Sequence, residues 1–107
     1  MINITVKKRK GSYLDLLSKG HAGYAEEGQD IVCAAVSALI INTVNSLETF
    51  TKEKFQAKDK DGYVSIIFEQ SPNTPEGKLL MDSLILGLTE IEHNYNNRYL
   101  TLKVKEV

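Results

Sequence analysis

The chain has 107 residues, enough for one domain with a modest hydrophobic core. With 13 basic and 14 acidic residues its net charge is about −1, which argues against direct nucleic-acid binding, because such binding depends on many Lys and Arg contacts to phosphates. The single cysteine excludes an intramolecular disulfide and is typical of a reducing cytosol.

The first segment alternates apolar and polar residues, with Ile2, Ile4 and Val6 on one side, and this pattern predicts a half-buried strand. Residues 7–11 are expected to form a basic turn, and residues 13–17 a second strand that pairs with the first as a hairpin. The N-terminus alternates and ends in charge, unlike a signal peptide, so a cytoplasmic protein is expected.

Residues 31–51 are apolar on nearly all sides, which predicts a central and largely buried helix. Asp30 is a good N-cap, so Ile31, Val32 and Cys33 should occupy the first three helical positions. The continuous apolar stretch ends at Ile41 and is judged too short to span a bilayer.

Asp61-Gly62 is a strong hairpin signal between strands near residues 55–58 and 63–69. Thr74 and Pro75 then open a second helix as N-cap and first helical residue. Its expected apolar stripe comprises Leu79, Leu80, Leu84, Leu88 and Ile91. Residues 100–104 alternate as a final strand. We therefore expect one α+β domain over residues 1–107, with the order β-β-α-β-β-α-β and two helices packed on a mixed or antiparallel sheet.

The candidate chemistry lies around Cys33. The thiolate is the nucleophilic form of cysteine, and the first turn of a helix favours it through unsatisfied N–H groups and the helix dipole. His21 lies upstream and could take the thiol proton if folding brings it close. Gly20, Gly23 and Gly28 predict a mobile loop around this histidine, and Tyr24 on that loop could line or cover a cleft.

Each of these residues also has a purely structural interpretation. A lone cysteine in an apolar helix is often only a small buried hydrophobe. Asp30 could orient His21 or act only as a helix cap. Ser37 follows Cys33 by one helical turn, so it could donate a hydrogen bond into the site or bond back to the Cys33 carbonyl. No metal site and no cofactor are predicted, because the sequence lacks a cluster of ligands with suitable spacing.

The segment Gly20-His21-Ala22, followed by Gly28-Gln29-Asp30-Ile31-Val32-Cys33-Ala34-Ala35-Val36-Ser37, resembles the signature of the ribosomal-processing cysteine protease family, Prp. The resemblance extends to the chain length and to the Thr-Pro-Glu-Gly-Lys helix start. It implies a bacterial endopeptidase that removes a short N-terminal extension from the large-subunit ribosomal protein numbered twenty-seven.

The same resemblance implies Cys33 as the nucleophile, His21 as the base, Asp30 and Ser37 as supporting residues, and a homodimer. The family's substrates carry paired phenylalanines before the cut, which implies an apolar cleft, expected to be lined from Tyr24, Val32 and the second helix. One alternative is a non-catalytic, dimeric binding module that docks on the ribosome, with Cys33 in the core. A second alternative is another cysteine hydrolase, such as a deamidase or isopeptidase, that uses the same pair.

Overall fold

The computed structural model describes residues 1–21, 23 and 30–107. Along these residues the elements follow the expected order β-β-α-β-β-α-β, which confirms the predicted α+β class. They are β1 (Ile2–Arg9), β2 (Ser12–Lys19), α1 (Ile31–Phe50), β3 (Phe55–Lys60), β4 (Tyr63–Phe68), α2 (Pro75–Asn94) and β5 (Leu100–Glu106).

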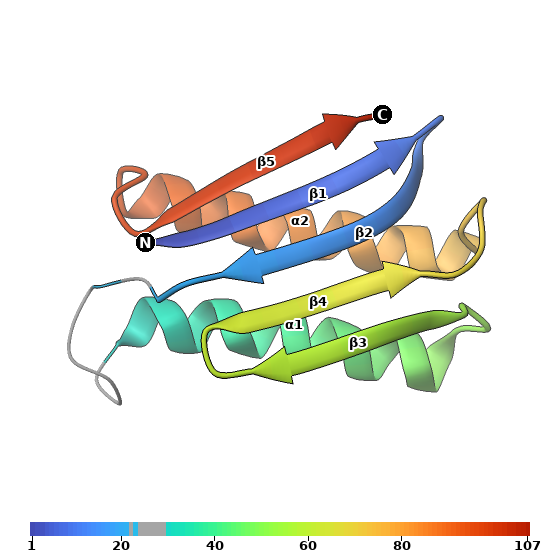
Figure 1. The fold of residues 1–107 in the computed structure, drawn as a ribbon, viewed down its shortest axis with the longest axis horizontal. Helices are drawn as coiled ribbons and strands as arrows, with labels where there is room; N and C mark the ends of the chain where they lie inside the picture. The colour runs from blue at the N-terminus through green and yellow to red at the C-terminus, as the bar shows by residue number, and fades with distance from the viewer. Residues whose placement is uncertain (22, 24–29) are drawn as a thin grey trace.

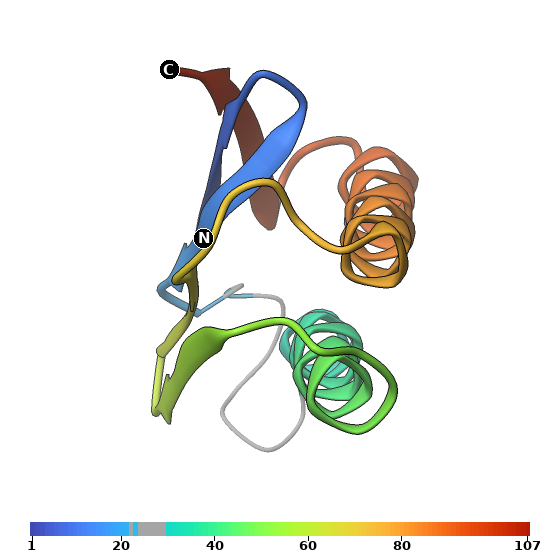
Figure 2. The ribbon, with the colours of Figure 1, turned by 90° about the vertical axis from the view of Figure 1, so that its right-hand side faces the viewer.

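The five strands form one mixed sheet in the order β3-β4-β2-β1-β5. β1 and β5 are parallel, because the chain returns to this edge after α2, and the other neighbours are antiparallel. Both helices cover the same face of the sheet, so the molecule has two layers and the other face is bare (Figures 1 and 2). In Figure 1 the bare face is turned toward the viewer.

The β1–β2 turn is shorter than the basic turn expected at residues 7–11. β1 continues to Arg9, and the turn itself consists of Lys10 and Gly11, with φ angles of 50° and 79°. Two consecutive residues with positive φ give a tight turn whose twist matches that of the strands. Charged residues at positions 7–9 are compatible with a strand here, because Lys7 and Arg9 are exposed and the Lys8 ammonium lies over the Tyr13 ring, 4.6 Å from its centroid.

The first helix begins where the sequence predicts, but its burial differs from the prediction. Only one face of α1 is buried against the sheet and α2. That face consists of Val32, Val36, Ile40, Thr43 and Leu47. Ile31 is 53% exposed, and Ala34, Ala35 and Ala38 are exposed as well. The expectation of a largely buried helix was wrong, because the two-layer fold covers α1 from one side only.

The helix continues beyond the apolar stretch that ends at Ile41. α1 has 20 residues and a mean hydropathy of 1.6, so by length and composition it could cross a membrane. A core helix of a packed domain passes the same test, and here the buried face of α1 belongs to the hydrophobic core. The apolar character of α1 therefore has a structural explanation in the core and in the exposed alanine-rich face.

The core lies between the sheet and the helices. Ile66 and Phe68 are buried and Val64 packs against them, as the alternation in this strand predicts. In α2, Met81, Leu84 and Leu88 are buried, whereas Leu79 is 68% exposed and does not belong to the buried stripe. The predicted cap of α2 is confirmed, because the Thr74 hydroxyl accepts a hydrogen bond from the amide of Gly77 at 3.0 Å.

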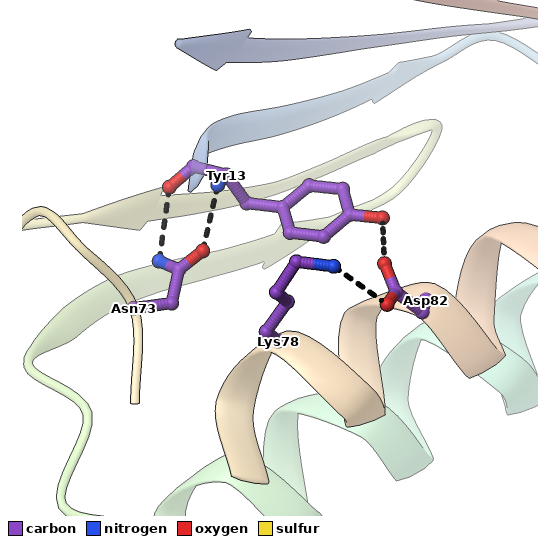
Figure 3. A network of polar contacts seen from close by, with 4 residues as sticks. All are labelled: Tyr13, Asn73, Lys78 and Asp82. Carbon is purple, nitrogen blue, oxygen red and sulfur yellow. Dashed lines mark hydrogen bonds and ion pairs between the residues drawn. The ribbon is translucent and has the colours of Figure 1, made fainter. Parts of the chain in front are cut away.

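A polar network joins the start of β2 to α2 (Figure 3). The Tyr13 hydroxyl donates to Asp82 at 2.6 Å, and Lys78 donates to the other oxygen of that carboxylate at 2.9 Å. Asn73 binds both backbone groups of Tyr13. Burial opposes the charge of Asp82, but the bonds from Tyr13 and Lys78 outweigh this and lower the pKa of the carboxyl. The network fixes α2 against the sheet at the end remote from Cys33.

Candidate active site

A cavity of about 590 Å³ lies between the first half of α1, the end of β2 and the β3–β4 turn. It brings together four residues that the sequence singles out, His21, Asp30, Cys33 and Ser37. Gly20 and Gly23 of the predicted loop also line it. Residues far apart in the sequence thus converge on one cavity of a size suited to part of a peptide.

Cys33 is the third residue of α1 and is half-buried in the cavity wall. The Asp30 carboxylate accepts a hydrogen bond of 2.9 Å from the Cys33 amide, which confirms the predicted N-cap. The thiol therefore stands in the first turn of a 20-residue helix, where the helix dipole and the unpaired amide groups stabilise an anion.

His21 follows the last residues of β2 and is held by the neighbouring β3–β4 turn. The amide of Gly20 donates a hydrogen bond of 2.8 Å to the carbonyl of Gly62. Gly20 has a φ of 97°, and a β-carbon there would stand 2.5 Å from the Met1 carbonyl oxygen. Glycine is thus required at this position both by the backbone conformation and by the close approach of the N-terminus.

Asp61 and Gly62 belong to the site, although their sequence predicts only a turn. The His21 Nε2 atom lies 3.8 Å from the Asp61 carboxylate, an ion-pair distance that is too long for a hydrogen bond. Both side chains are exposed, so solvent weakens this pair in the unbound protein. An Asp-Gly hairpin signal cannot reveal this role, because only the tertiary fold brings the turn to His21.

The chain is similar in sequence to proteins of one known family. A model of the family described as cysteine protease Prp matches residues 1–100. The chain belongs to this family. It is 33% identical to the ribosomal processing cysteine protease Prp of Staphylococcus aureus strain Mu50 over 96 residues, which cover 89% of this chain and 90% of the relative. It is 32% identical to the Prp of Bacillus subtilis strain 168 over 105 residues, with 91% and 92% covered.

The fold agrees with this assignment. A crystal structure of the essential ribosomal processing protease Prp from S. aureus, in complex with a covalently linked product peptide, matches with a TM-score of 0.90. The two chains are 30% identical, and the match covers 98% of this chain and 100% of the other. This Prp family member is a cysteine protease, and the alternative of a non-catalytic binding module is set aside.

The remaining walls of the Prp cavity are partly apolar. Ile2, Val36, Ile40 and Val64 contribute to them. Val32 and α2, which were expected to line the cleft, do not: Val32 lies on the buried face of α1, and every lining residue precedes position 65. The physical reason is that α2 covers the β1–β5 side of the sheet, away from the cavity.

Ser37 lines the cavity one turn after Cys33 and is exposed, so both of its predicted roles stay open. Gly23 has a φ of 76°, which suits glycine. Tyr24 and Gly28, also predicted for the loop, lie outside the described residues. Within the described part of the chain, no three His, Cys, Asp or Glu side chains are grouped so that they could hold a metal ion.

Proposed function

We propose that this Prp cysteine protease removes the N-terminal extension of the large-subunit ribosomal protein numbered twenty-seven, by acyl transfer through Cys33 and His21. The observation that carries the proposal is the cavity whose lining includes both a helix-start thiol and a histidine. The names of the relatives support ribosomal processing as the task, and the peptide bound to the S. aureus enzyme supports a peptide substrate.

In the first step the Cys33 thiolate attacks the scissile carbonyl carbon and a thioester forms. The peptide C–N bond breaks, and His21 donates its proton to the departing amine. Because Nε2 of His21 is turned toward Asp61, Nδ1 is the ring nitrogen proposed to exchange the proton with Cys33. Asp61 would hold the ring in this orientation.

In the second step His21 takes a proton from water, and the resulting hydroxide attacks the thioester. The C–S bond breaks, the acid product leaves, and the Cys33 thiolate is restored. The oxyanion formed in each step needs hydrogen-bond donors. We propose backbone amides at the start of α1 as these donors, because the first turn of a helix has N–H groups without intrahelical partners.

The apolar part of the cavity is the proposed site for the aromatic residues that precede the cut. Ile2, Val36, Ile40 and Val64 form this part of the wall. Replacing paired phenylalanines of the substrate with serines should abolish cleavage, because the aromatic rings would no longer bury apolar surface. Undiminished cleavage of the serine peptide would reject this assignment.

A homodimer is proposed to cover the exposed face of α1. Ile31, Ala34, Ala35 and Ala38 recur at the spacing of one helix face and leave a flat apolar stripe. A second copy packed there would lie beside the cavity, since Ala34 also lines it. Ala38→Glu should therefore give a monomer by light scattering, whereas an unchanged dimer would reject this interface. We expect the protein to act in the cytosol.

The proposal is tested with a peptide that spans the ribosomal-protein extension. Wild-type protein, Cys33→Ala and His21→Ala are incubated with it, and fragments are followed by mass spectrometry. Cleavage by the wild type alone, at the junction of aromatic and small residues, is expected. Cleavage that persists in Cys33→Ala would reject the nucleophile, and cleavage of an unrelated amide bond in preference would point to a different hydrolase.

A further inference from the structure

The bare face of the sheet is formed by one set of alternating side chains from every strand. Side chains alternate between the two faces along a strand, and Ile2, Ile4 and Val6 point into the core. Their neighbours in sequence therefore point to the bare face, and the register aligns them in three rows. Across the sheet the rows are Gln56–Ile67–Asp15–Lys7–Lys105, Lys58–Ser65–Leu17–Thr5–Lys103 and Lys60–Tyr63–Lys19–Asn3–Thr101.

This face, which we call the lysine face, is strongly basic. It carries six exposed lysines and a single carboxylate, that of Asp15. The lysines are Lys7, Lys19, Lys58, Lys60, Lys103 and Lys105. The helix layer has the opposite charge. The charged residue of α1 is Glu48, and α2 carries one lysine, Lys78, and four acidic residues, Glu76, Asp82, Glu90 and Glu92. The near-neutral net charge thus conceals two oppositely charged faces.

Five of the six lysines lie near opposite edges of the sheet, and Lys19 lies between them on the central strand β2. Lys7, Lys103 and Lys105 lie on β1 and β5, and Lys58 and Lys60 lie on the opposite edge strand β3. The outer strands are four strand spacings apart, roughly 19 Å at about 4.8 Å for each spacing. Such a distance allows the two groups to reach the two phosphate strands of one double helix.

We propose that the lysine face binds double-helical RNA through its phosphate backbone. Lysine is a compact point charge that suits phosphate without reading base sequence. A flat sheet fits the wide, shallow minor groove of A-form RNA, whereas the major groove of B-form DNA takes a helix or a two-stranded ribbon. This binding does not depend on the peptidase chemistry proposed above.

Other occupants fit less well. A second copy would bring six lysines against six lysines, and like charges across an interface oppose association. A membrane needs apolar side chains to insert, and Ile67 is the one large exposed hydrophobic residue on this face within the described chain. Lys60 and Tyr63 belong to both the lysine face and the cavity wall, so bound RNA would lie beside the active site.

The test measures the binding of a fluorescein-labelled 16-base-pair RNA hairpin by anisotropy between low and physiological salt. Lys103→Gln/Lys105→Gln and Lys19→Gln/Lys58→Gln each remove two charges without touching the cavity wall. Each pair should weaken binding at least several-fold at low salt. The slope of log K against log salt should become shallower by about 0.9 for each phosphate contact that is lost.

The matched control is Lys52→Gln/Arg98→Gln, which removes the same charge from the connections that precede β3 and β5, outside the three rows of the lysine face. This control should bind RNA as the wild type does, and thermal melting should show that all variants fold. Equal binding by wild type and the lysine-face variants would overturn the proposal. Equal competition by polyglutamate or by phosphatidylglycerol vesicles would also overturn it, and would indicate an acidic protein or a lipid surface.

Discussion

The imidazole of His21 occupies the space beside Gly62, and its Nε2 atom is only 2.9 Å from the point where a β-carbon would stand. Gly62 also has a φ of 69°, a backbone conformation that side chains disfavour. Gly62→Ala should therefore displace the His21 ring and reduce kcat/KM at least tenfold, because the proposed base loses its position. Peptide cleavage by the purified variant measures this.

Gly11 offers a matched control for the change at Gly62. It has a φ of 79° in the β1–β2 turn, and no atom lies within 4 Å of an added β-carbon. Gly11→Ala and Gly62→Ala should both lose about 1 kcal/mol in the free energy of unfolding, because both place alanine at positive φ. Only Gly62→Ala should lose activity. An equal loss in both would show that strain in the turns, and not the imidazole, is responsible.

Asp61 provides the second prediction. Its carboxylate lies 3.8 Å from His21 Nε2. The interaction between these two groups should become stronger when substrate excludes water from the cavity. Asp61→Asn should lower kcat several-fold with little change in KM, because the His21 ring loses the contact that orients it. Asp59→Asn, which changes a second carboxylate on the cavity wall, is the control. If both variants behave alike, Asp61 acts only through the overall charge of the cavity.

The ionisation of Tyr13 should make the free energy of unfolding depend on pH in the alkaline range. Burial, and then the hydrogen bond to Asp82 and the charge of Asp82, raise the pKa of Tyr13 well above its usual 10. The folded state thus holds a proton that the unfolded chain releases above pH 10, so this contribution to stability is complete below pH 10 and is lost as the pH rises further. Urea unfolding of wild type and Tyr13→Phe at pH 8 to 11 measures it.

In this comparison Tyr13→Phe should be less stable at pH 8 by about 1–2 kcal/mol, because a hydrogen bond to a charged acceptor is lost. The difference from the wild type should shrink as the pH rises above 10. A difference that stays constant up to pH 11 would contradict the role of the Tyr13 proton. Cleavage of the peptide should change little at neutral pH, since this network lies away from the cavity.

Substitutions of Asp30 can distinguish a role in helix capping from a role in catalysis. Asparagine caps a helix as well as aspartate does, so Asp30→Asn should keep the melting temperature, whereas Asp30→Ala should lose about 1 kcal/mol of stability. If Asp30 serves only as a cap, Asp30→Asn keeps its activity. A large fall in turnover at unchanged thermal stability would assign the carboxylate a role beside Cys33 or His21.

The sequence predicts local structure well where one physical rule dominates. The caps at Asp30 and Thr74 and the Asp61–Gly62 turn each depend on neighbouring residues and agree with the structure. Burial was predicted less well, because the apolar pattern of α1 does not reveal that a two-layer fold covers only one of its faces. Leu79 was assigned to the core for the same reason.

The site was predictable only in part. Cys33 and His21 carry recognisable chemistry, and the structure places both on one cavity. Asp61 and Gly62 carry no such signal, because a turn reaches His21 only through the pairing of β2 with β4. Similarly, the lysine face depends on the register of five strands that are far apart in the sequence. The composition of any one segment therefore does not reveal it.

Every residue that lines the cavity comes from positions 2–64, and β5 forms the edge of the sheet opposite β3 (Figure 1). The two halves of the chain therefore tolerate engineering differently. A fluorescent or affinity tag joined after Val107 would follow the edge strand and leave the entrance for a peptide unobstructed. Surface changes on α2 can likewise adjust solubility or crystal contacts while the protease retains its substrate preference.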